Sequence, residues 1–321
     1  MTIFRPLTLA ASLTLALTGV ASAQEATLRA ISAFQLGTTF AKPFEDFVAS
    51  VNENGKGIVQ INVMGGPEAM PPMEIGNALR GGVVDLANTT AVFHANLVPE
   101  GVALTMTNRN MAELRENGGY DLMNKLHEDK AGIHWLGRPV QDIPYHIYLS
   151  EPIEGDSFEG LKLRSVPVYQ AFFAALGAVP VQMSPGDVYT ALERGAIDGF
   201  GWPAIGIFDL GWQEKTKARI NPGFYQVETG IYLSKKTWDG LTDEQRAFLD
   251  AQMIALEGEA AGFTALAEAE AVKQEEVGIA MITLPDDKAA EYEQKAQDSG
   301  WEMIISSSPE NGPKLRELFV K

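Results

Sequence analysis

The chain contains no cysteine. This absence excludes a disulfide framework, a thiolate zinc site and a cysteine nucleophile. An exported protein of this size needs no disulfides when its hydrophobic core is large, and about 300 residues usually form two domains. We therefore expect two domains that are held together by apolar cores.

Basic residues are scarce, with 25 lysines and arginines against 42 aspartates and glutamates and a formal net charge of −17. Such a balance argues against nucleic acid or an anionic membrane surface as the partner. The acidity is typical of a well-solvated surface. It does not exclude a locally positive pocket.

Long apolar runs are absent except at the N-terminus. Arg5 precedes an apolar core from Leu7 to Val20, and Ala21-Ser22-Ala23 has the small residues of a cleavage site. We predict that residues 1–23 form a signal peptide, cleaved after Ala23. The alternative is an uncleaved membrane anchor, but the run is shorter than the about 20 residues that a spanning helix needs. The sequence thus predicts an exported protein with no membrane insertion.

Catalytic and cofactor motifs are also missing. There is no Gly-x-Ser-x-Gly elbow and no phosphate loop, and the glycines of Gly199–Ala204 fall short of a dinucleotide fingerprint. The histidines lack the spacing of metal ligands, so we interpret each as a surface or packed residue and expect no cofactor and no metal. These histidines are His94, His127, His134 and His146. An exported enzyme of α/β type that acts on an organic acid is kept as an alternative function.

Two similar segments of alternating strands and helices are present. The first begins with a strand at Thr27–Ser32, and the second lies between Gly160 and Pro203. In each unit a glycine after the second helix precedes an apolar-Asp pair that contains Asp85 or Asp198. This pattern predicts an α/β fold with two sheets that face each other across a cleft.

Two extended segments are expected to cross between the halves, one within Ile133–Leu149 and one within Gly230–Ser234. Thr242 opens a capping-box sequence, and the helix that follows is expected to run toward Glu276 with a solvated acidic face. That face comprises Glu257, Glu259, Glu268 and Glu270. We predict that lobe I comprises residues 24–141 and 230–270, and that lobe II comprises residues 142–229 and 271–321.

Arg164 ends the first strand of the second unit. Parallel strands place their carboxyl ends on one edge of the sheet, where open α/β folds bind ligands. A guanidinium there can hold a carboxylate, although an ordinary salt bridge is the alternative. Other candidate lining residues follow neighbouring strands, and each could equally be core. These candidates are Trp202, Phe34, Thr89, Thr90 and Phe93.

Several blocks of the sequence resemble the solute-binding proteins of tripartite ATP-independent periplasmic (TRAP) transporters, the DctP type. The blocks include Phe158–Arg164, Ala174–Ala178, Val188–Leu192, Gly195–Gly199 and Lys235–Leu241. The resemblance covers nearly the whole chain after the signal. It implies a two-lobed periplasmic binding protein fold of type II, and a periplasmic receptor that captures an organic acid anion for a TRAP membrane permease.

The resemblance also assigns residues. The carboxylate-clamping arginine of the family falls on Arg164, and the glutamine of lactate and 2-oxo-acid receptors falls on Gln141. Sialic-acid and dicarboxylate members have an asparagine where this chain has Trp202, and a second arginine where it has Pro144. The 2-oxo-acid receptors have a metal-binding glutamate where this chain has Gly201. We therefore expect a small monocarboxylate such as a 2-oxo, hydroxy or cyclic acid, with no bound metal; dicarboxylate binding and a sensory receptor stay open as alternatives.

Overall fold

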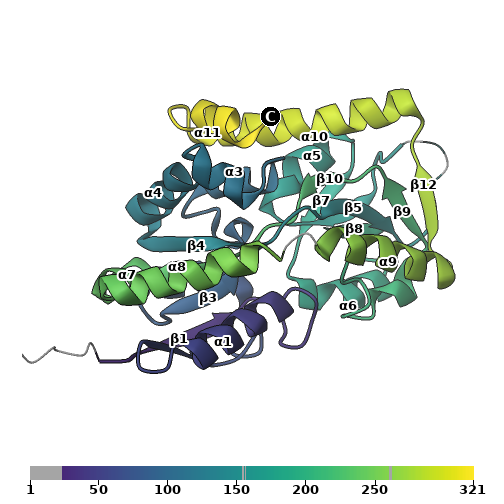
Figure 1. Cartoon of the computed structure of the whole chain (residues 1–321). Helices are drawn as coiled ribbons and strands as arrows, with labels where there is room; N and C mark the ends of the chain where they lie inside the picture. The colour runs from purple at the N-terminus through teal and green to yellow at the C-terminus, as the bar shows by residue number, and fades with distance from the viewer. Residues whose placement is uncertain (1–23, 154, 156, 260–261) are drawn as a thin grey trace, which may run out of the picture.

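The computed structural model describes residues 24–153, 155, 157–259 and 262–321. The predicted signal peptide lies outside the described residues. The fold is α/β, as predicted, and it contains two sheets with helices packed around them (Figure 1). Each sheet forms the centre of one lobe.

The first sheet has five strands, and its first three form the predicted parallel unit. Strand β1 lies between β2 and β3, to both of which it is parallel. Strand β11 is antiparallel to β3 and to β4. In spatial order the strands are β2 (Val59–Val63), β1 (Ala26–Ser32), β3 (Leu86–Thr89), β11 (Thr229–Ser234) and β4 (Ile133–Val140).

The second sheet repeats this arrangement. Strand β6 lies between β7 and β8, to both of which it is parallel, and β5 is antiparallel to β8 and β9. The main path is β12 (Ala280–Thr283), β9 (Ala218–Asn221), β5 (Pro144–Leu149), β8 (Gly199–Pro203), β6 (Lys162–Ser165) and β7 (Val179–Gln182). The short strand β10 (Phe224–Gln226) lies off this path and pairs antiparallel with the start of β5, at Pro144 and Tyr145.

The helices cover both sheets. The helices of the N-terminal half are α1 (Lys42–Asn54), α2 (Ile75–Gly81), α3 (Met111–Glu116) and α4 (Gly119–Ala131). Those of the C-terminal half are α5 (Gln170–Ala175), α6 (Val188–Glu193), α7 (Lys235–Gly240), α8 (Asp243–Glu257), α9 (Gly262–Glu276), α10 (Asp286–Ser307) and α11 (Gly312–Phe319). Two 3-10 helices that matter below are η2 (Ala91–His94) and η3 (Pro99–Thr105).

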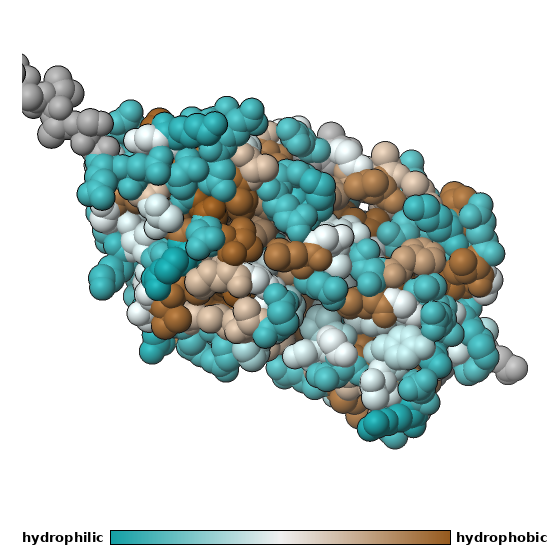
Figure 2. All heavy atoms as spheres, turned by 90° about the horizontal axis from the view of Figure 1, so that it is seen from below, coloured by the Kyte–Doolittle hydropathy of each residue, from teal (hydrophilic) through white to brown (hydrophobic). Residues whose placement is uncertain are grey.

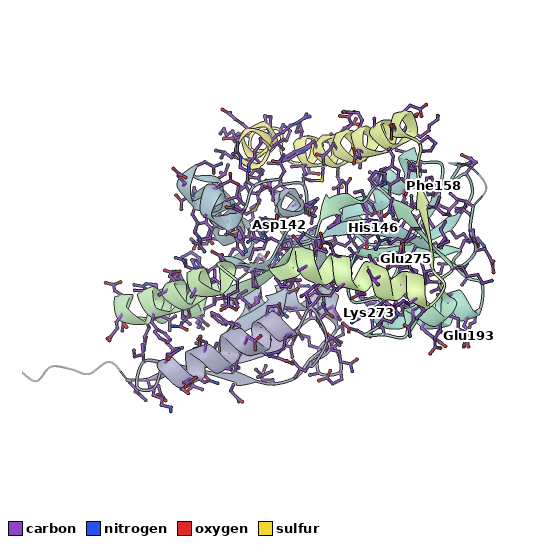
Figure 3. All side chains as sticks on the ribbon, turned by 45° about the vertical axis from the view of Figure 1, so that its right-hand side comes forward. Asp142, His146, Phe158, Glu193, Lys273 and Glu275 are labelled. Atoms are coloured by element: carbon purple, nitrogen blue, oxygen red, sulfur yellow. The ribbon has the colours of Figure 1, made fainter. Side chains whose placement is uncertain are left out.

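Two short extended passages join the sheets, and the chain crosses once more through the helices between β11 and β12. The first passage, residues 141–143, joins β4 to β5 and contains Asp142, whose φ of 61° turns the chain there (Figure 3). The second passage, residues 227–228, joins β10 to β11 and lies just before the segment expected from the sequence. The two passages are bonded together, because Val227 N donates to Ile143 O at 2.8 Å.

The expected return helix comprises two helices, α8 and α9. The capping box at the start of α8 is confirmed: Gln245 N donates to Thr242 Oγ1 and Thr242 N donates to Gln245 Oε1. Glycine has a low helix propensity, and Gly258 follows the last residue of α8.

The prediction that the acidic residues of this segment form one solvated face is wrong for two of them. Glu257 is 8% exposed and pairs with Arg115 at 3.0 Å. Glu270 is half-buried and accepts a hydrogen bond from Ile207 N at 3.1 Å, which attaches α9 to the second sheet's loops.

The last two helices connect the lobes. Helix α10 packs against α5 beside the second sheet and against η3 of the N-terminal half, and α11 packs against α4 (Figure 1). Figure 2 shows a face on which hydrophilic residues predominate and hydrophobic residues gather in smaller patches. No helix among the described residues has the length and hydropathy needed to cross a membrane.

Candidate functional site

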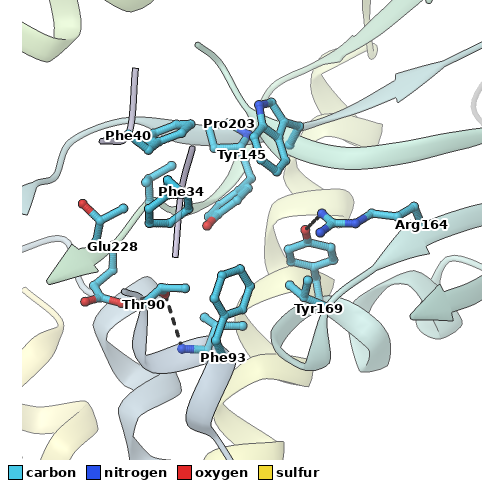
Figure 4. A pocket seen from close by; sticks show the side chains of 14 residues that line it. Phe34, Phe40, Thr90, Phe93, Tyr145, Arg164, Tyr169, Pro203 and Glu228 are labelled. Carbon is cyan, nitrogen blue, oxygen red and sulfur yellow. Dashed lines mark hydrogen bonds between the residues drawn. The ribbon is translucent and has the colours of Figure 1, made fainter. Parts of the chain in front are cut away.

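A pocket lies between the two sheets and the second passage (Figure 4). Its free space, counted together with its opening to solvent, is about 400 Å³. Its lining is mostly aromatic, with two charged side chains. The lining residues are Phe34, Phe40, Thr90, Val92, Phe93, Tyr145, Arg164, Val166, Tyr169, Trp202, Pro203, Val227, Glu228 and Thr229.

Arg164 reaches this pocket from β6 and is only 1% exposed. Its Nε donates to Met183 O at 3.1 Å, and its Nη1 donates to Tyr169 Oη at 3.0 Å and Gly201 O at 3.2 Å. Its Nη2 is buried with no hydrogen-bond partner, and no ion pair to a carboxylate is formed within the described part of the chain. The guanidinium is therefore rigidly held, uncompensated in charge, and has one amino group to offer.

Tyr169 and Gly201 hold this arginine in place. Tyr169 accepts from Arg164 and donates to Gly201 O at 3.1 Å; burial raises the pKa of this tyrosine. A Cβ at position 201 would lie 2.8 Å from Tyr169 Cε2 and 2.9 Å from Phe173 Cζ. The backbone at 201 thus approaches the rings so closely that only glycine fits without a shift.

Aromatic rings from both lobes form one wall. The Trp202 ring of β8 lies edge-on to Phe40 at 6.0 Å, and Phe40 lies 5.7 Å from Phe34. The guanidinium carbon of Arg164 lies 5.6 Å from the Trp202 ring centroid, within cation–π range. Phe34 has a second aromatic neighbour, Phe93 of η2, and the two ring centroids lie 6.2 Å apart.

Glu228 lies on the opposite side of the pocket from Arg164 (Figure 4) and is 1% exposed. Its Oε2 accepts from Thr90 Oγ1 and Ala91 N, both at 2.8 Å, and its Oε1 accepts from Tyr232 Oη at 2.8 Å. Burial raises the pKa of Glu228, and the hydrogen bonds and the charge of Arg138 offset part of that increase. The pocket therefore has a basic side and an acidic side.

The structure brings five of the seven residues expected from the sequence to the pocket, and two lie elsewhere. Thr89 is buried at the end of β3, outside the lining, and its hydroxyl has no partner among the described residues. Gln141 is buried in the first passage, where its Oε1 accepts from Met111 N at 3.2 Å and Arg138 Nη2 at 3.1 Å. Its side chain is thus engaged within lobe I and does not line the pocket.

Four polar lining residues were not expected from the sequence: Tyr145, Tyr169, Glu228 and Thr229. Tyr169 lies in the apolar helix that follows Arg164, so its spacing indicated only core. Glu228 lies in the second passage, and an acidic residue before a strand gives no signal of its own. The fold alone brings these residues to Arg164.

A second, outer hollow of about 930 Å³ adjoins the pocket. Phe34, Phe40 and Trp202 line both spaces, so these rings form the partition between them. Beside the partition, Thr39 N donates to Asp209 Oδ2 at 2.8 Å. This bond joins the loop before α1 to the loop after β8, and it therefore connects the two lobes at the rim.

No group of three or more histidine, aspartate or glutamate side chains that could hold a metal ion occurs within residues 24–321 as far as they are described. The four histidines are all buried, in agreement with their interpretation as packed residues. Burial lowers the pKa of His146 to about 4, and its Nδ1 lies 2.8 Å from Ile220 O (Figure 3).

The fold is similar to that of solved TRAP periplasmic solute-binding proteins. A structure from Desulfovibrio salexigens with bound orotic acid has a TM-score of 0.81 at 15% identity, over 91% of this chain and 97% of that one. A structure from Roseobacter denitrificans with bound L-galactonate has a TM-score of 0.78 at 19% identity, over 92% and 99%. At this identity the likeness concerns the fold.

Sequence comparisons agree with the fold. The C4-dicarboxylate-binding periplasmic protein DctP of Rhodobacter capsulatus is 35% identical over 100 residues, which is 30% of each chain. The alignments with the first curated relatives span about a third of their length. The family model described as "Bacterial extracellular solute-binding protein, family 7" matches residues 32–306. The chain therefore belongs to this family of bacterial extracellular solute-binding proteins, the DctP family.

Proposed function

We propose that this protein is the extracytoplasmic receptor of a TRAP transporter and binds a small organic acid, in particular a monocarboxylate. The observation that carries the proposal is the buried guanidinium of Arg164, which lines the pocket and has an Nη2 with no hydrogen-bond partner among the described residues. A buried cation without a counter-ion is costly, and an anionic ligand removes that cost. The ligand carboxylate accepts its hydrogen bonds from Nη2.

Closure of the lobes completes the site. Arg164 and Trp202 belong to the second sheet, whereas Phe34, Phe40 and Phe93 come from the N-terminal half. When the lobes approach, the rings exclude water, and the ion pair is stronger in the less polar site. A ligand that contacts both lobes favours the closed form, so binding and closure are one equilibrium.

The relatives support the chemical class. The R. denitrificans and D. salexigens proteins hold carboxylic acids, according to the descriptions of their structures. The dicarboxylate alternative has a relative in its favour, the R. capsulatus protein. In this chain, however, Arg164 and Glu228 are the charged lining residues, so no second cation is available for a second carboxylate.

We further propose a periplasmic location, with cleavage of the signal peptide after Ala23 and delivery of the ligand to TRAP permease subunits. The family is extracellular by description. N-terminal sequencing of the exported protein checks the cleavage site. A mature chain that begins at Gln24 is the expected result.

A thermal-shift screen of the purified protein tests the ligand class. It should compare monocarboxylates, dicarboxylates, 2-oxo acids and cyclic acids with neutral amides of the same shape. A ligand at 100 times its dissociation constant stabilises the folded state by about 2.7 kcal/mol. We expect stabilisation by small monocarboxylates and recovery of the acid unchanged. If no acid raises the melting temperature, the proposal is contradicted.

A further inference from the structure

The side of the pocket formed by Glu228 is polar and incompletely satisfied. The Glu228 carboxylate accepts three hydrogen bonds, from Thr90 Oγ1, Ala91 N and Tyr232 Oη. A carboxylate offers about four lone-pair directions. One acceptor direction of a buried carboxylate is therefore left for a further donor.

Two neighbouring hydroxyls are also without partners. Thr229 lines the pocket, and its buried Oγ1 makes no hydrogen bond to any residue that the structure describes. The Tyr145 side chain lies between the Glu228 and Arg164 sides of the pocket (Figure 4), and its hydroxyl has no bond to any described residue. An unsatisfied buried polar group costs about 1–3 kcal/mol. A ligand that bonds to Thr229 Oγ1 gains part of that free energy, and the Tyr145 hydroxyl offers a further hydrogen bond.

We propose that Glu228 determines specificity and that the ligand is a monocarboxylate with an N–H or O–H donor on the side away from its carboxylate. The inference rests on the proposed function, because Arg164 must first fix the orientation of the acid. Acids whose hydroxyl or lactam N–H is remote from the carboxylate have such a donor. An oxo group or a second carboxylate at that position would instead place its oxygen against the oxygens of Glu228.

Glu228 and Arg164 recognise different parts of the ligand. Arg164 recognises the charge common to all organic acids, whereas Glu228 recognises what the rest of the molecule carries. A site that bonds to a ligand donor rejects the analogue that lacks it, because the buried acceptor is then left unpaired. Discrimination between otherwise matched acids is therefore the property to measure.

Calorimetric titration with matched pairs of acids tests the proposal. The pairs are 3-hydroxypropionate with propionate, 4-hydroxybutyrate with butyrate, and 3-hydroxycyclopentanecarboxylate with cyclopentanecarboxylate. For the pair that fits the pocket best, we expect the wild-type protein to prefer the donor-bearing acid at least about tenfold, equivalent to about 1.4 kcal/mol. In Glu228→Gln this preference should fall by about the same factor, while the acid without the donor keeps its affinity.

Glu100→Gln is the matched control, because Glu100 is another buried glutamate of the N-terminal half and lies outside the pocket. Its preference should equal that of the wild type. If Glu228→Gln does not fold, Thr229→Val provides the same comparison, since that hydroxyl has no protein partner to lose. There the preference should fall by a smaller factor.

Three outcomes are informative. The inference is supported if the preference falls in Glu228→Gln or Thr229→Val and is unchanged in Glu100→Gln. An absent preference in the wild type, or an unchanged one in the variants, overturns the inference and leaves the receptor function intact. If none of the six acids nor any other carboxylate binds, the receptor function fails, and the inference fails with it.

Discussion

The first and second sheets contain the same three-strand unit, and their amino ends are nearly identical. In the first, Asp85 Oδ2 accepts from the backbone N of Arg29 at 2.9 Å. In the second, Asp198 Oδ2 accepts from the backbone N of Lys162 at 2.8 Å. The neighbouring registers match as well. Each aspartate anchors the backbone of the adjacent strand, which is a structural role.

The two units differ toward their carboxyl ends. Ile31 pairs with Ala87 in the first sheet, and Arg164 pairs with Phe200 at the equivalent position of the second. Both side chains are 1% exposed. The same buried position is therefore apolar in one lobe and cationic in the other. The comparison indicates that the second lobe holds the ligand's charge and the first lobe closes over it.

The next two equivalent residues, Asn88 of the first sheet and Gly201 of the second, also differ. Asn88 in the first sheet donates to Ser32 Oγ and to Phe40 O, which fixes the backbone of a partition residue. Its counterpart Gly201 has no side chain and leaves space for the ring of Tyr169. In the first lobe the residue at this position, Asn88, holds the partition residue Phe40. In the second lobe Gly201 leaves room for Tyr169, which holds Arg164.

Replacing Ile31 with arginine is expected to have the largest effect. It introduces a charge like that of Arg164 without the hydrogen-bond acceptors that surround Arg164. The guanidinium would be buried in a hydrophobic core with no acceptor prepared for it. We expect a loss of about 3–5 kcal/mol in the free energy of unfolding, measured by urea denaturation. Ile31→Val is the control and should cost about 0.5–1.5 kcal/mol. Wild-type stability in Ile31→Arg would show that this site tolerates a charge.

Gly201→Ala sharpens the comparison at the adjacent position. The added Cβ overlaps Tyr169 and Phe173, so the unfolding free energy should fall by about 1–3 kcal/mol. Because Tyr169 positions Arg164, acid binding should weaken about tenfold, or about 1.4 kcal/mol. Calorimetry and urea denaturation give both values. Gly240→Ala, where nothing lies within 4 Å, is the control; equal behaviour of the two variants would contradict the argument.

Asp209→Ala tests the contribution of closure. Removing the acceptor of Thr39 N loses a hydrogen bond worth about 0.5–1.5 kcal/mol. Acid affinity should therefore weaken about two- to tenfold, and small-angle scattering should show a more open unliganded protein. Asp187→Ala changes another acid of the outer hollow that has no such bond in the described structure. Unchanged affinity and shape in Asp209→Ala would exclude the rim bond as a determinant of closure.

Asp85→Asn is expected to have the smallest effect, a loss of stability that is present at neutral pH and disappears at acidic pH. Burial raises the pKa of Asp85, but hydrogen bonds from the Arg29 side chain and backbone and from Thr237 outweigh burial and hold it below its usual value. The carboxylate therefore stabilises the fold above its unfolded pKa of about 3.9, and the stabilisation is lost as pH falls through the lower folded value. Urea denaturation between pH 5 and pH 2 should show a shallower acid decline in the variant, whereas equal slopes would contradict the prediction. Arg29→Ala should reproduce the shallower decline.

The sequence predicted the scaffold well because the scaffold depends on local signals. Glycine after the second helix, alternating strands and the Thr242 capping box each act within a few residues. The position of Arg164 at the pocket follows from the same signals, because parallel strands place their carboxyl ends on the edge of the sheet where open α/β folds bind ligands. Whether it binds a carboxylate stays a prediction.

The remainder of the pocket depends on contacts between distant segments. Glu228 meets Thr90 and Ala91 over more than 130 positions of sequence, and no local pattern announces that encounter. Gln141 was assigned by resemblance alone, and the course of the first passage directs it to Arg138 instead. Glu257 belongs to an acidic stretch of the sequence, yet its side chain is buried in an ion pair with Arg115. In each case a partner far along the chain decides the outcome.

The most direct test of the central claim is calorimetric titration of the best acid from the screen into Arg164→Ala. Removing a buried charged partner typically costs about 2–5 kcal/mol, so we expect affinity to fall at least about 30-fold. Arg29→Ala, at the opposite lobe and outside the pocket, should bind as the wild type does. An Arg164→Ala protein that folds and binds the acid with wild-type affinity would contradict the account.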